Sequence, residues 1–360
     1  MRAEIAILGA GPVGCALALL LRASGRSVAL AERRPRDDAA PAARPIALSH
    51  ASRIILERAG AWGALAVTPI ETVHVSQAGG FGQTRMTAAD AGVPALGYVI
   101  DSGALAVSLA ARVEAAGIAI EDGGARAETE NREALLLVHA EGTGTDTNEK
   151  RYHQTAVVAL VSAGPRAANT AYERFTPDGP LALLPLAGGY GVVWATRAER
   201  ASALVAMPQR EFLDSLESAF GTRAGRFTSV EGRARVPLAL RVRAARVEER
   251  QAYVGNSAQT LHPVAGQGLN LGLRDAWELS RAIGEAADPG DPMLLRQYAA
   301  HRRLDAFAAI RVTDLLAGLF TGTNPLLSAA RGAAMCAIDL WAPARRFFAR
   351  RMIYGPSAIP

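Results

Sequence analysis

A strand–glycine turn–helix–strand pattern at the start of the chain is the feature that most restricts its fold. The apolar run Ile5–Leu8 is typical of a buried strand, and Gly9-Ala10-Gly11-Pro12-Val13-Gly14 follows it directly. Residues 15–22 continue at helical spacing, and a second strand over 28–30 ends at Glu32. Such a βαβ unit requires a parallel sheet, so the sequence predicts an α/β fold.

The three glycines of this turn have separate physical roles. Gly9 permits a tight turn, Gly11 lets the backbone approach a pyrophosphate, and Gly14 lets the helix pack closely on the strand. The helix N-terminus offers unpaired N–H groups to phosphates. Glu32 follows 21 residues after Gly11 and would accept hydrogen bonds from the adenosine ribose. Together these features predict a dinucleotide site, with a glycine-rich turn that binds nothing as the alternative.

A second glycine cluster lies far along the chain, over residues 253–278. Gly255 follows a strand end, a loop with Pro263 comes next, and Gly266-Gln267-Gly268 opens a helix. In a flavin site, this helix N-terminus would face the pyrimidine end of the ring, where negative charge collects on reduction. A distant closing segment of this kind favours FAD as the bound dinucleotide. The alternative is an ordinary strand–loop–helix connection.

Composition excludes several classes of protein. Cys15 and Cys336 are the only cysteines, which excludes a disulfide framework, a cysteine zinc site and an iron–sulfur cluster. Lys150 is the only lysine and no GxxxxGK loop is present, so an ATPase and a PLP enzyme lose their central group. The six histidines lack metal-ligand spacing, and we expect no metal site.

Charge and hydropathy indicate a globular chain. Half of the 360 residues are apolar, and 39 Lys and Arg stand against 34 Asp and Glu. The arginines are scattered and aromatic residues make up only 6%, so we expect no nucleic-acid binding. No signal peptide is visible, and the N-terminal apolar helix is too short to span a membrane. We therefore expect a cytoplasmic protein.

The rest of the chain is mixed and then helical. An apolar strand is predicted over 134–138, and a polar tract over 142–151 precedes strand-like runs such as 156–161. From Asp275 onward the pattern is mostly helical.

Six stretches resemble one known family. They are GAGPVG with Glu32, RPIALS (44–49), YHQTA (152–156), AYERFTPDGPLALLPL (171–186), GNSAQTLHPVAGQGLNLGLRD (255–275) and RQYAAHRRLDAFAAIRVTDLLAGLF (296–320). The chain resembles the FAD-dependent aromatic hydroxylases of the para-hydroxybenzoate hydroxylase fold. Within them it is most similar to the ubiquinone-biosynthesis branch, closest to the 2-polyprenyl-6-methoxyphenol hydroxylases.

This resemblance implies a domain organisation. A discontinuous, Rossmann-like FAD-binding domain would comprise residues 1–70, 96–150 and 250–290. An inserted substrate domain with a mixed β-sheet would comprise 71–95 and 151–249, and residues 291–360 would form a C-terminal helical region.

The resemblance also implies a set of cofactor-binding residues. The ADP half of FAD would be held by Gly9, Gly11, Gly14, Glu32 and Arg44, although a solvated loop arginine is the alternative for Arg44. Glu141-Gly142 stands where the family usually has Asp-Gly near the pyrophosphate. Gly255 and Asn256 would lie by the ribityl–pyrophosphate. The isoalloxazine would be lined by Pro263, Gly266, Gly268 and Asn270.

The implied reaction is aromatic hydroxylation. NAD(P)H, which docks transiently and needs no second fingerprint, would reduce FAD. O2 would then give a flavin hydroperoxide that transfers OH to a polyprenyl phenol. His262 is the candidate group for deprotonating the phenol, and a structural loop histidine is the alternative.

Two other interpretations stay open. The region 121–151 is shorter than in the family, which would suit a non-catalytic or weakly FAD-binding scaffold member of a ubiquinone-biosynthesis complex. A reductase acting on prenyl double bonds would keep the flavin and change the reaction.

The C-terminal segment has two interpretations as well. Apolar helix candidates over 314–320 and 326–341 lie beside five arginines, which are Arg331, Arg345, Arg346, Arg350 and Arg351. A basic amphipathic tail of this kind can lie on anionic lipid at the inner membrane. A helical pack with a solvated basic face is the alternative.

Overall fold

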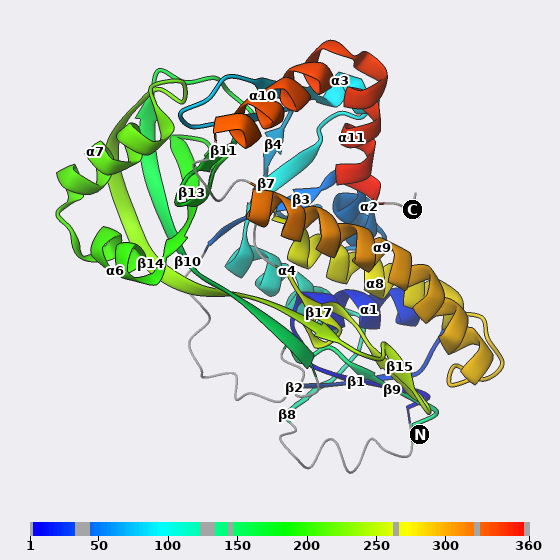
Figure 1. Ribbon diagram of the computed structural model, residues 1–360. Coiled ribbons are helices and arrows are strands. Elements are labelled where there is room, and N and C mark those ends of the chain that lie inside the picture. The colour runs from blue at the N-terminus through cyan, green and yellow to red at the C-terminus, as the bar shows by residue number, and fades with distance from the viewer. Residues whose placement is uncertain are drawn as a thin grey trace.

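The computed structural model describes residues 3–32, 44–122, 134–142, 147–261, 266–319 and 325–355. Its elements form two large sheets, one small sheet and a set of helices that lie between and beside them (Figure 1). Within these residues, no helix combines the length and the hydropathy needed to cross a bilayer.

A six-stranded sheet contains the N-terminal strand. Its central strands β16, β9, β1, β2 and β8 pair in parallel, and β15 adds to the edge in antiparallel fashion. In sheet order the strands are β15 (Val247–Glu248), β16 (Gln251–Tyr253), β9 (Leu136–His139), β1 (Ile5–Leu8), β2 (Val28–Glu32) and β8 (Ile120–Asp122). The predicted βαβ unit and the predicted strand near 134–138 are therefore confirmed.

Helices α1 (Pro12–Ala23) and α8 (Gln267–Ile283) pack together against this sheet. A Cβ atom at residue 272 would lie 2.7 Å from Val13 Cγ2, so only glycine lets the two helices approach this closely. The buried apolar side chains of both helices join those of the strands in one core. Two segments more than 240 residues apart in the sequence thus form one packed layer.

The second sheet has eight strands and is largely antiparallel. Only β11 and β5 pair in parallel. In sheet order the strands are β17 (Gln259–Thr260), β14 (Arg226–Arg243), β10 (Thr147–Gly164), β13 (Gly189–Arg197), β12 (Gly179–Leu186), β11 (Thr170–Thr176), β5 (Thr72–Gln77) and β6 (Gln83–Thr87). Helices α6 (Ala198–Ala206) and α7 (Gln209–Phe220) cover one face over a core around Trp194 and Phe212.

The remaining strands and helices connect these layers. A three-stranded sheet is formed by β3 (Pro45–Ser49), β7 (Gly97–Asp101) and β4 (Thr68–Ile70). The other helical elements before residue 290 are α2 (His50–Arg58), α3 (Ala88–Ala91), α4 (Ser102–Ala115) and the 3-10 turn η2 (Gly255–Ser257). The C-terminal helices are α9 (Pro292–Leu319), α10 (Pro325–Leu340) and α11 (Ala342–Tyr354), in line with the predicted helical end.

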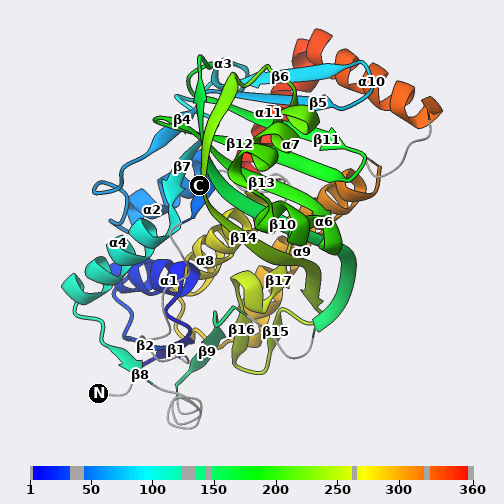
Figure 2. The same ribbon diagram turned by 90° about the vertical axis from the view of Figure 1, so that its left-hand side faces the viewer.

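The long strands β10 and β14 of the eight-stranded sheet extend from it toward the six-stranded sheet (Figure 2). β10 begins at Thr147, inside the polar tract, because residues 147–151 pair with Arg243 to Ala239 of β14. The predicted boundary between residues 150 and 151 therefore lies within a strand. In addition, β15 belongs to the six-stranded sheet and β17 to the eight-stranded one, opposite to the predicted ranges. The division into three regions otherwise stays a prediction.

Candidate cofactor site

The carboxyl ends of four parallel strands meet at one edge of the six-stranded sheet. Leu8 is in register with Ala31 of β2 and with His139 of β9, and His139 is in register with Tyr253 of β16. The backbone pairing continues past the strands, since Ala140 N donates to Leu8 O at 2.7 Å. The residues that follow these strands therefore lie side by side, at the edge where α/β sheets bind their ligands.

The glycine turn after β1 is closely packed on one side and open on the other. Gly9 has a φ of +104°, and a Cβ there would lie 2.5 Å from the carbonyl carbon of Ala140. A Cβ on Gly14 would lie 1.9 Å from Gly9 O. By contrast, no atom of the described residues lies within 4 Å of a Cβ built on Gly11. Gly9 and Gly14 are thus required by packing, whereas Gly11 leaves a face of backbone that a pyrophosphate could approach.

The N-terminus of α1 is available to an anion. Its N-cap residue is Gly11, and no side chain in the described ranges makes a capping hydrogen bond there. First-turn N–H groups without a side-chain cap are the donors that bind phosphates in dinucleotide folds. Glu32 lies at the same turn, where its Oε2 accepts a hydrogen bond from Ala10 N at 3.0 Å. The predicted contacts of Gly11 with a pyrophosphate and of Glu32 with a ribose stay predictions.

Glu141 and Gly142 follow β9 beside this turn. His139 Nδ1 lies 3.2 Å from Glu141 Oε1, and its Nε2 lies 2.9 Å from Gln251 Oε1. Burial lowers the pKa of His139, but Glu141 and Gln251 together outweigh it and leave that pKa raised. Gly142 N donates to Ser257 Oγ at 3.3 Å, which links this strand end to η2.

The second glycine segment lies against the first. Gly255 has a φ of +59°, and a Cβ there would lie 3.2 Å from Val13 Cγ2 of α1. Asn256, the next residue of η2, has an exposed side chain. Gly266 is the N-cap of α8 with a φ of +58°, and a Cβ on Gly268 would meet nothing within 4 Å. Gly255 of the second glycine cluster thus lies next to the helix that follows the first cluster. His262 and Pro263 lie outside the described residues.

The amide of Asn270 is engaged in hydrogen bonds within the protein, and its predicted place in the lining of the isoalloxazine stays a prediction. Its Nδ2 donates to Ala47 O at 3.1 Å and to Gly266 O at 2.7 Å. Its Oδ1 accepts from Ser49 N at 2.8 Å and from Ser52 Oγ at 2.7 Å. An amide has two donors and two acceptor positions, so this buried side chain has no hydrogen bond left for a flavin. Asn270 therefore fastens α8 to β3 and α2.

Arg44 lies directly before β3, next to the start of α4. Its backbone N donates to Ser102 Oγ at 3.2 Å, and its carbonyl oxygen accepts from Ser102 N at 2.9 Å. The predicted contact of its guanidinium with the ADP half of FAD stays a prediction.

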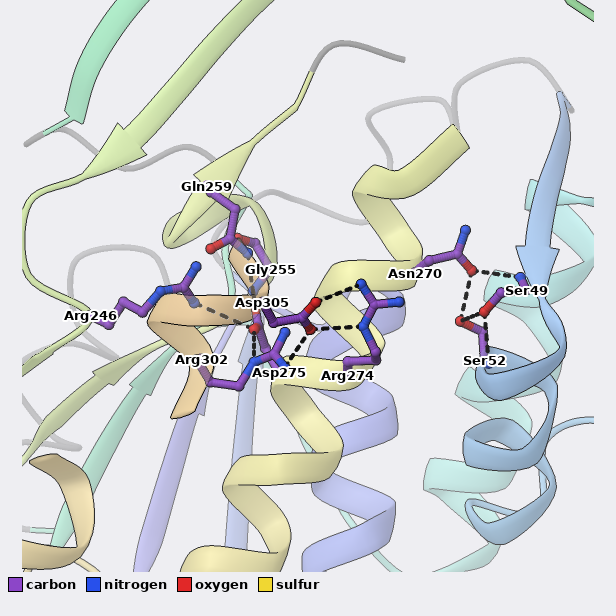
Figure 3. A network of polar contacts seen from close by, with 10 residues as sticks. All are labelled: Ser49, Ser52, Arg246, Gly255, Gln259, Asn270, Arg274, Asp275, Arg302 and Asp305. Carbon is purple, nitrogen blue, oxygen red and sulfur yellow. Dashed lines mark hydrogen bonds and ion pairs between the residues drawn. The ribbon is translucent and has the colours of Figure 1, made fainter. Parts of the chain in front are cut away.

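A buried network of charges lies behind Gly255 and holds it in place (Figure 3). Asp275 of α8 accepts hydrogen bonds at Oδ2 from Gly255 N (3.1 Å) and from Gln259 Nε2 (2.7 Å). Its Oδ1 accepts from Arg302 Nε of α9 at 2.7 Å. Burial would raise the pKa of Asp275, but Arg302 and then Arg246 hold it below its usual range.

A second carboxylate completes this network. Asp305 Oδ2 accepts from Arg274 Nε at 2.9 Å, and Arg302 Nη1 forms an ion pair with the same oxygen at 2.6 Å. All four side chains, Arg274, Asp275, Arg302 and Asp305, are at most 2% exposed. Buried charges are tolerated only when they are paired in this way.

Sequence reasoning did not identify this network. One signal for it exists, because Arg274 and Asp275 interrupt the apolar positions of α8, and Arg302 and Asp305 lie three residues apart on α9. Charged residues on a buried helix face indicate buried pairing. The partner of each residue could not be read from that spacing, since the decisive pairs join two different helices.

The comparisons with known proteins agree with this geometry. A family model described as an FAD binding domain matches residues 127–313, which include Gly255 and the whole of α8. Ubiquinone hydroxylase UbiL of Rhodospirillum rubrum is 30% identical, over 97% of this chain and 89% of that protein. The 3-demethoxyubiquinol 3-hydroxylase of Escherichia coli is 29% identical, over 93% of this chain and 94% of that protein.

Among solved structures, p-nitrophenol 4-monooxygenase PnpA from Pseudomonas putida has a TM-score of 0.75 against this chain. The match covers 97% of this chain and 96% of that one at 15% sequence identity. At this identity the likeness concerns the fold, which is the α/β fold predicted from the sequence.

The network predicts that replacing the charged side chain of Asp275 by an uncharged one of the same shape strongly lowers stability. Asp275→Asn should lower the free energy of unfolding by about 3 kcal/mol, because it leaves buried guanidinium groups without their partner. Urea unfolding of the cofactor-free protein, followed by circular dichroism, measures this change. Asp288→Asn is the matched control, since it removes an exposed ion pair with Arg250 at 2.8 Å and should have no measurable effect. Equal unfolding midpoints for the two variants would contradict the role of Asp275.

Proposed function

Because this chain belongs to the family with this FAD binding domain, we propose that it is an FAD-dependent monooxygenase of ubiquinone biosynthesis. It hydroxylates the aromatic ring of a polyprenyl phenol, with NAD(P)H and O2 as co-substrates. The observation that carries the proposal is the convergence of the two glycine segments, where Gly255 lies against Val13 of α1. The names of two relatives, a ubiquinone hydroxylase and a 3-demethoxyubiquinol 3-hydroxylase, support the substrate class.

The residues of the carboxyl edge fit FAD. The open face of Gly11 and the uncapped start of α1 would hold the pyrophosphate, and Glu32 would accept from the ribose. The N-terminus of α8 at Gly266 and Gly268 would face the ring end, where its partial positive charge stabilises the reduced form. Bound FAD supplies the redox chemistry, taking electrons from NAD(P)H and activating O2. The chain positions the ring and excludes water around it.

A scaffold without cofactor is the alternative. Features at the carboxyl edge of the six-stranded sheet support the enzyme instead. A scaffold without cofactor would not require an open glycine at the N-terminus of α1. The buried hydrogen bonds of Asp275 and Asn270 also fix the orientation of Gly255 and α8, as a binding site with a rigid geometry requires.

Gly11→Val separates cofactor binding from folding. Apart from its chain neighbours, its Cβ would meet no atom of the described residues within 4 Å, so the cofactor-free protein should unfold at the same urea concentration as the wild type. The added methyl groups should block the pyrophosphate, and the purified variant should lack flavin absorbance. Gly63→Val, a substitution at another open glycine in an exposed loop, is the control that should stay yellow. A variant at residue 11 that retains FAD like the wild type would refute the pyrophosphate assignment.

The reaction predicts a defined product. With NAD(P)H, O2 and a prenylated phenol, the flavin-loaded protein should form a product heavier by one oxygen atom, detected by mass spectrometry. A product heavier by two hydrogen atoms would indicate a prenyl reductase. A colourless protein that takes up no added FAD would indicate a scaffold.

We further propose that α10 and α11 contact an anionic bilayer, from which a polyprenyl phenol would enter. Both helices lie at the margin of the molecule in Figure 1, and α10 also projects from it in Figure 2. Leu340 is 85% exposed and Trp341 is 65% exposed at the junction of the two helices. Arg346 and Arg350 are exposed on α11 nearby. Apolar groups beside cations are the combination that binds anionic lipid.

Vesicle co-sedimentation tests this contact. The double variant Arg346→Gln/Arg350→Gln should bind phosphatidylglycerol-containing vesicles about 30-fold more weakly, because each arginine contributes about 1 kcal/mol. The double variant Arg22→Gln/Arg210→Gln, at exposed positions far from the C-terminus, should bind like the wild type. Equal binding of both double variants, or equal binding to pure phosphatidylcholine, would contradict the proposal.

A further inference from the structure

Strand β11 of the eight-stranded sheet carries an acidic residue, Glu173, between two residues whose side chains lie on the opposite face of the sheet. Tyr172 packs edge-on against Phe220 of α7, with ring centroids 5.4 Å apart. Arg174 donates from Nε to Ala219 O of α7 at 3.1 Å. Because side chains alternate along a strand, Glu173 lies on the face away from α7.

That face meets the elements of the candidate cofactor site. Ala171, two residues before Glu173 on the same face, packs with Ile70 and Val99 of the three-stranded sheet, and Ala47 of β3 joins the same cluster. A Cβ on Gly266, the N-cap of α8, would lie 3.6 Å from Ala47 Cβ. Ala47 thus packs on the sheet face that carries Glu173 and also lies next to Gly266, the glycine at the predicted flavin-ring end.

One carboxyl oxygen of Glu173 is buried and has no hydrogen-bond partner among the described residues. This oxygen is Oε1, and part of the residue remains accessible. Burial raises the pKa of Glu173 to about 7, and no neighbouring charge contributes to this shift. An unpaired buried carboxyl is unfavourable for folding, so its presence indicates a function.

The two strands that pair with β11 supply no charge beside Glu173. In register, Glu173 is paired with Ala182 of β12 and Val75 of β5. β12 carries no titratable side chain, and the only one of β5, His74, contacts Tyr172 on the α7 side.

Three charged groups on the helices that cover β5 and β6 have partners of their own. On α10, Arg331 Nε donates to Gln77 Oε1, and Asp339 Oδ1 accepts from Arg85 N. On α11, Arg345 pairs with Asp90.

We infer that the carboxylate of Glu173 binds the phenol hydroxyl of the substrate and takes up its proton. This inference rests on the proposed hydroxylase function. The phenol O–H bond breaks, the proton moves to the carboxylate oxygen, and the electron pair stays on the phenolate. The added electron density activates the ring carbon that receives oxygen. When the hydroxylated ring becomes aromatic again, the carbon that received oxygen loses its own proton to water. The phenolate oxygen takes the first proton back from the carboxyl group, and the carboxylate is restored.

Glu173→Gln tests this role, because glutamine keeps the shape and cannot accept the proton. The variant should retain full flavin absorbance and form hydroxylated product at least about 100-fold more slowly than the wild type. Glu173→Asp should recover part of the rate. Glu231→Gln, the same substitution at an exposed position of β14, is the control and should have wild-type activity.

The pH profile gives a readout that a purely structural role would not move. The wild-type rate should rise as pH increases through about 7, since the ionised carboxylate is the active form, and this limb should be absent in Glu173→Gln. The folded-state pKa lies above the ordinary 4.5, so protonated Glu173 stabilises the fold at low pH. Relative to Glu173→Gln, the wild type should lose thermal stability as pH rises from 4.5 to about 7 and change no further above that.

Two results would overturn the inference, and they differ. If the wild type forms product and Glu173→Gln forms it equally fast with the same pH profile, Glu173 is not the proton acceptor while the hydroxylase function stands. If the flavin-loaded wild type forms no hydroxylated product, the proposed function is wrong and the inference falls with it.

Discussion

The parallel pairing of β2, β1, β9 and β16 is the constraint on which the candidate site depends. Parallel strands bring all their carboxyl ends to one edge, so residues that follow four separate strands become neighbours. Glu32, Gly9, Glu141 and Gly255 are assembled in this way, although they span more than 220 residues of sequence. The turn after β1 must then pass Ala140 so closely that only glycine fits at position 9. Most of the site is accordingly backbone, as expected for a surface that binds phosphates.

Two polar bridges fix the helix that faces the ring end of this site. Asn270 ties the first turns of α8 to β3 and α2, and Asp275 ties its middle to Gly255 and, through Arg302, to α9. Removing the charges of Asp275 and Arg302 from water opposes folding. Their pairing offsets this unfavourable free energy only when both partners are present. A helix held at two points by directional bonds cannot slide or rotate. The geometry at Gly266 and Gly268 is therefore set by contacts outside the site.

Local patterns allowed much of this arrangement to be predicted, and long-range pairing limited the rest. The βαβ unit could be predicted because its strands, turn and helix each leave a pattern within a few residues. Both glycine segments could be predicted for the same reason. The start of β10 in a polar tract could not, because its hydrogen-bond partners lie almost 100 residues away on β14. The motif that contains Asn270 was recognised, but only the structure shows that its amide is saturated inside the protein. Likewise, nothing near Glu173 in the sequence indicates that one of its carboxyl oxygens lacks a hydrogen-bond partner among the described residues.

The central claim is that the two glycine segments hold one FAD between them. Hydrogen–deuterium exchange of the cofactor-free protein, titrated with FAD and followed by mass spectrometry, tests it most directly. The account predicts that the amides that follow Gly11 and those that follow Gly266 become protected together, with the same dependence on FAD concentration. Protection of one segment without the other, or of neither while FAD is bound, would contradict it.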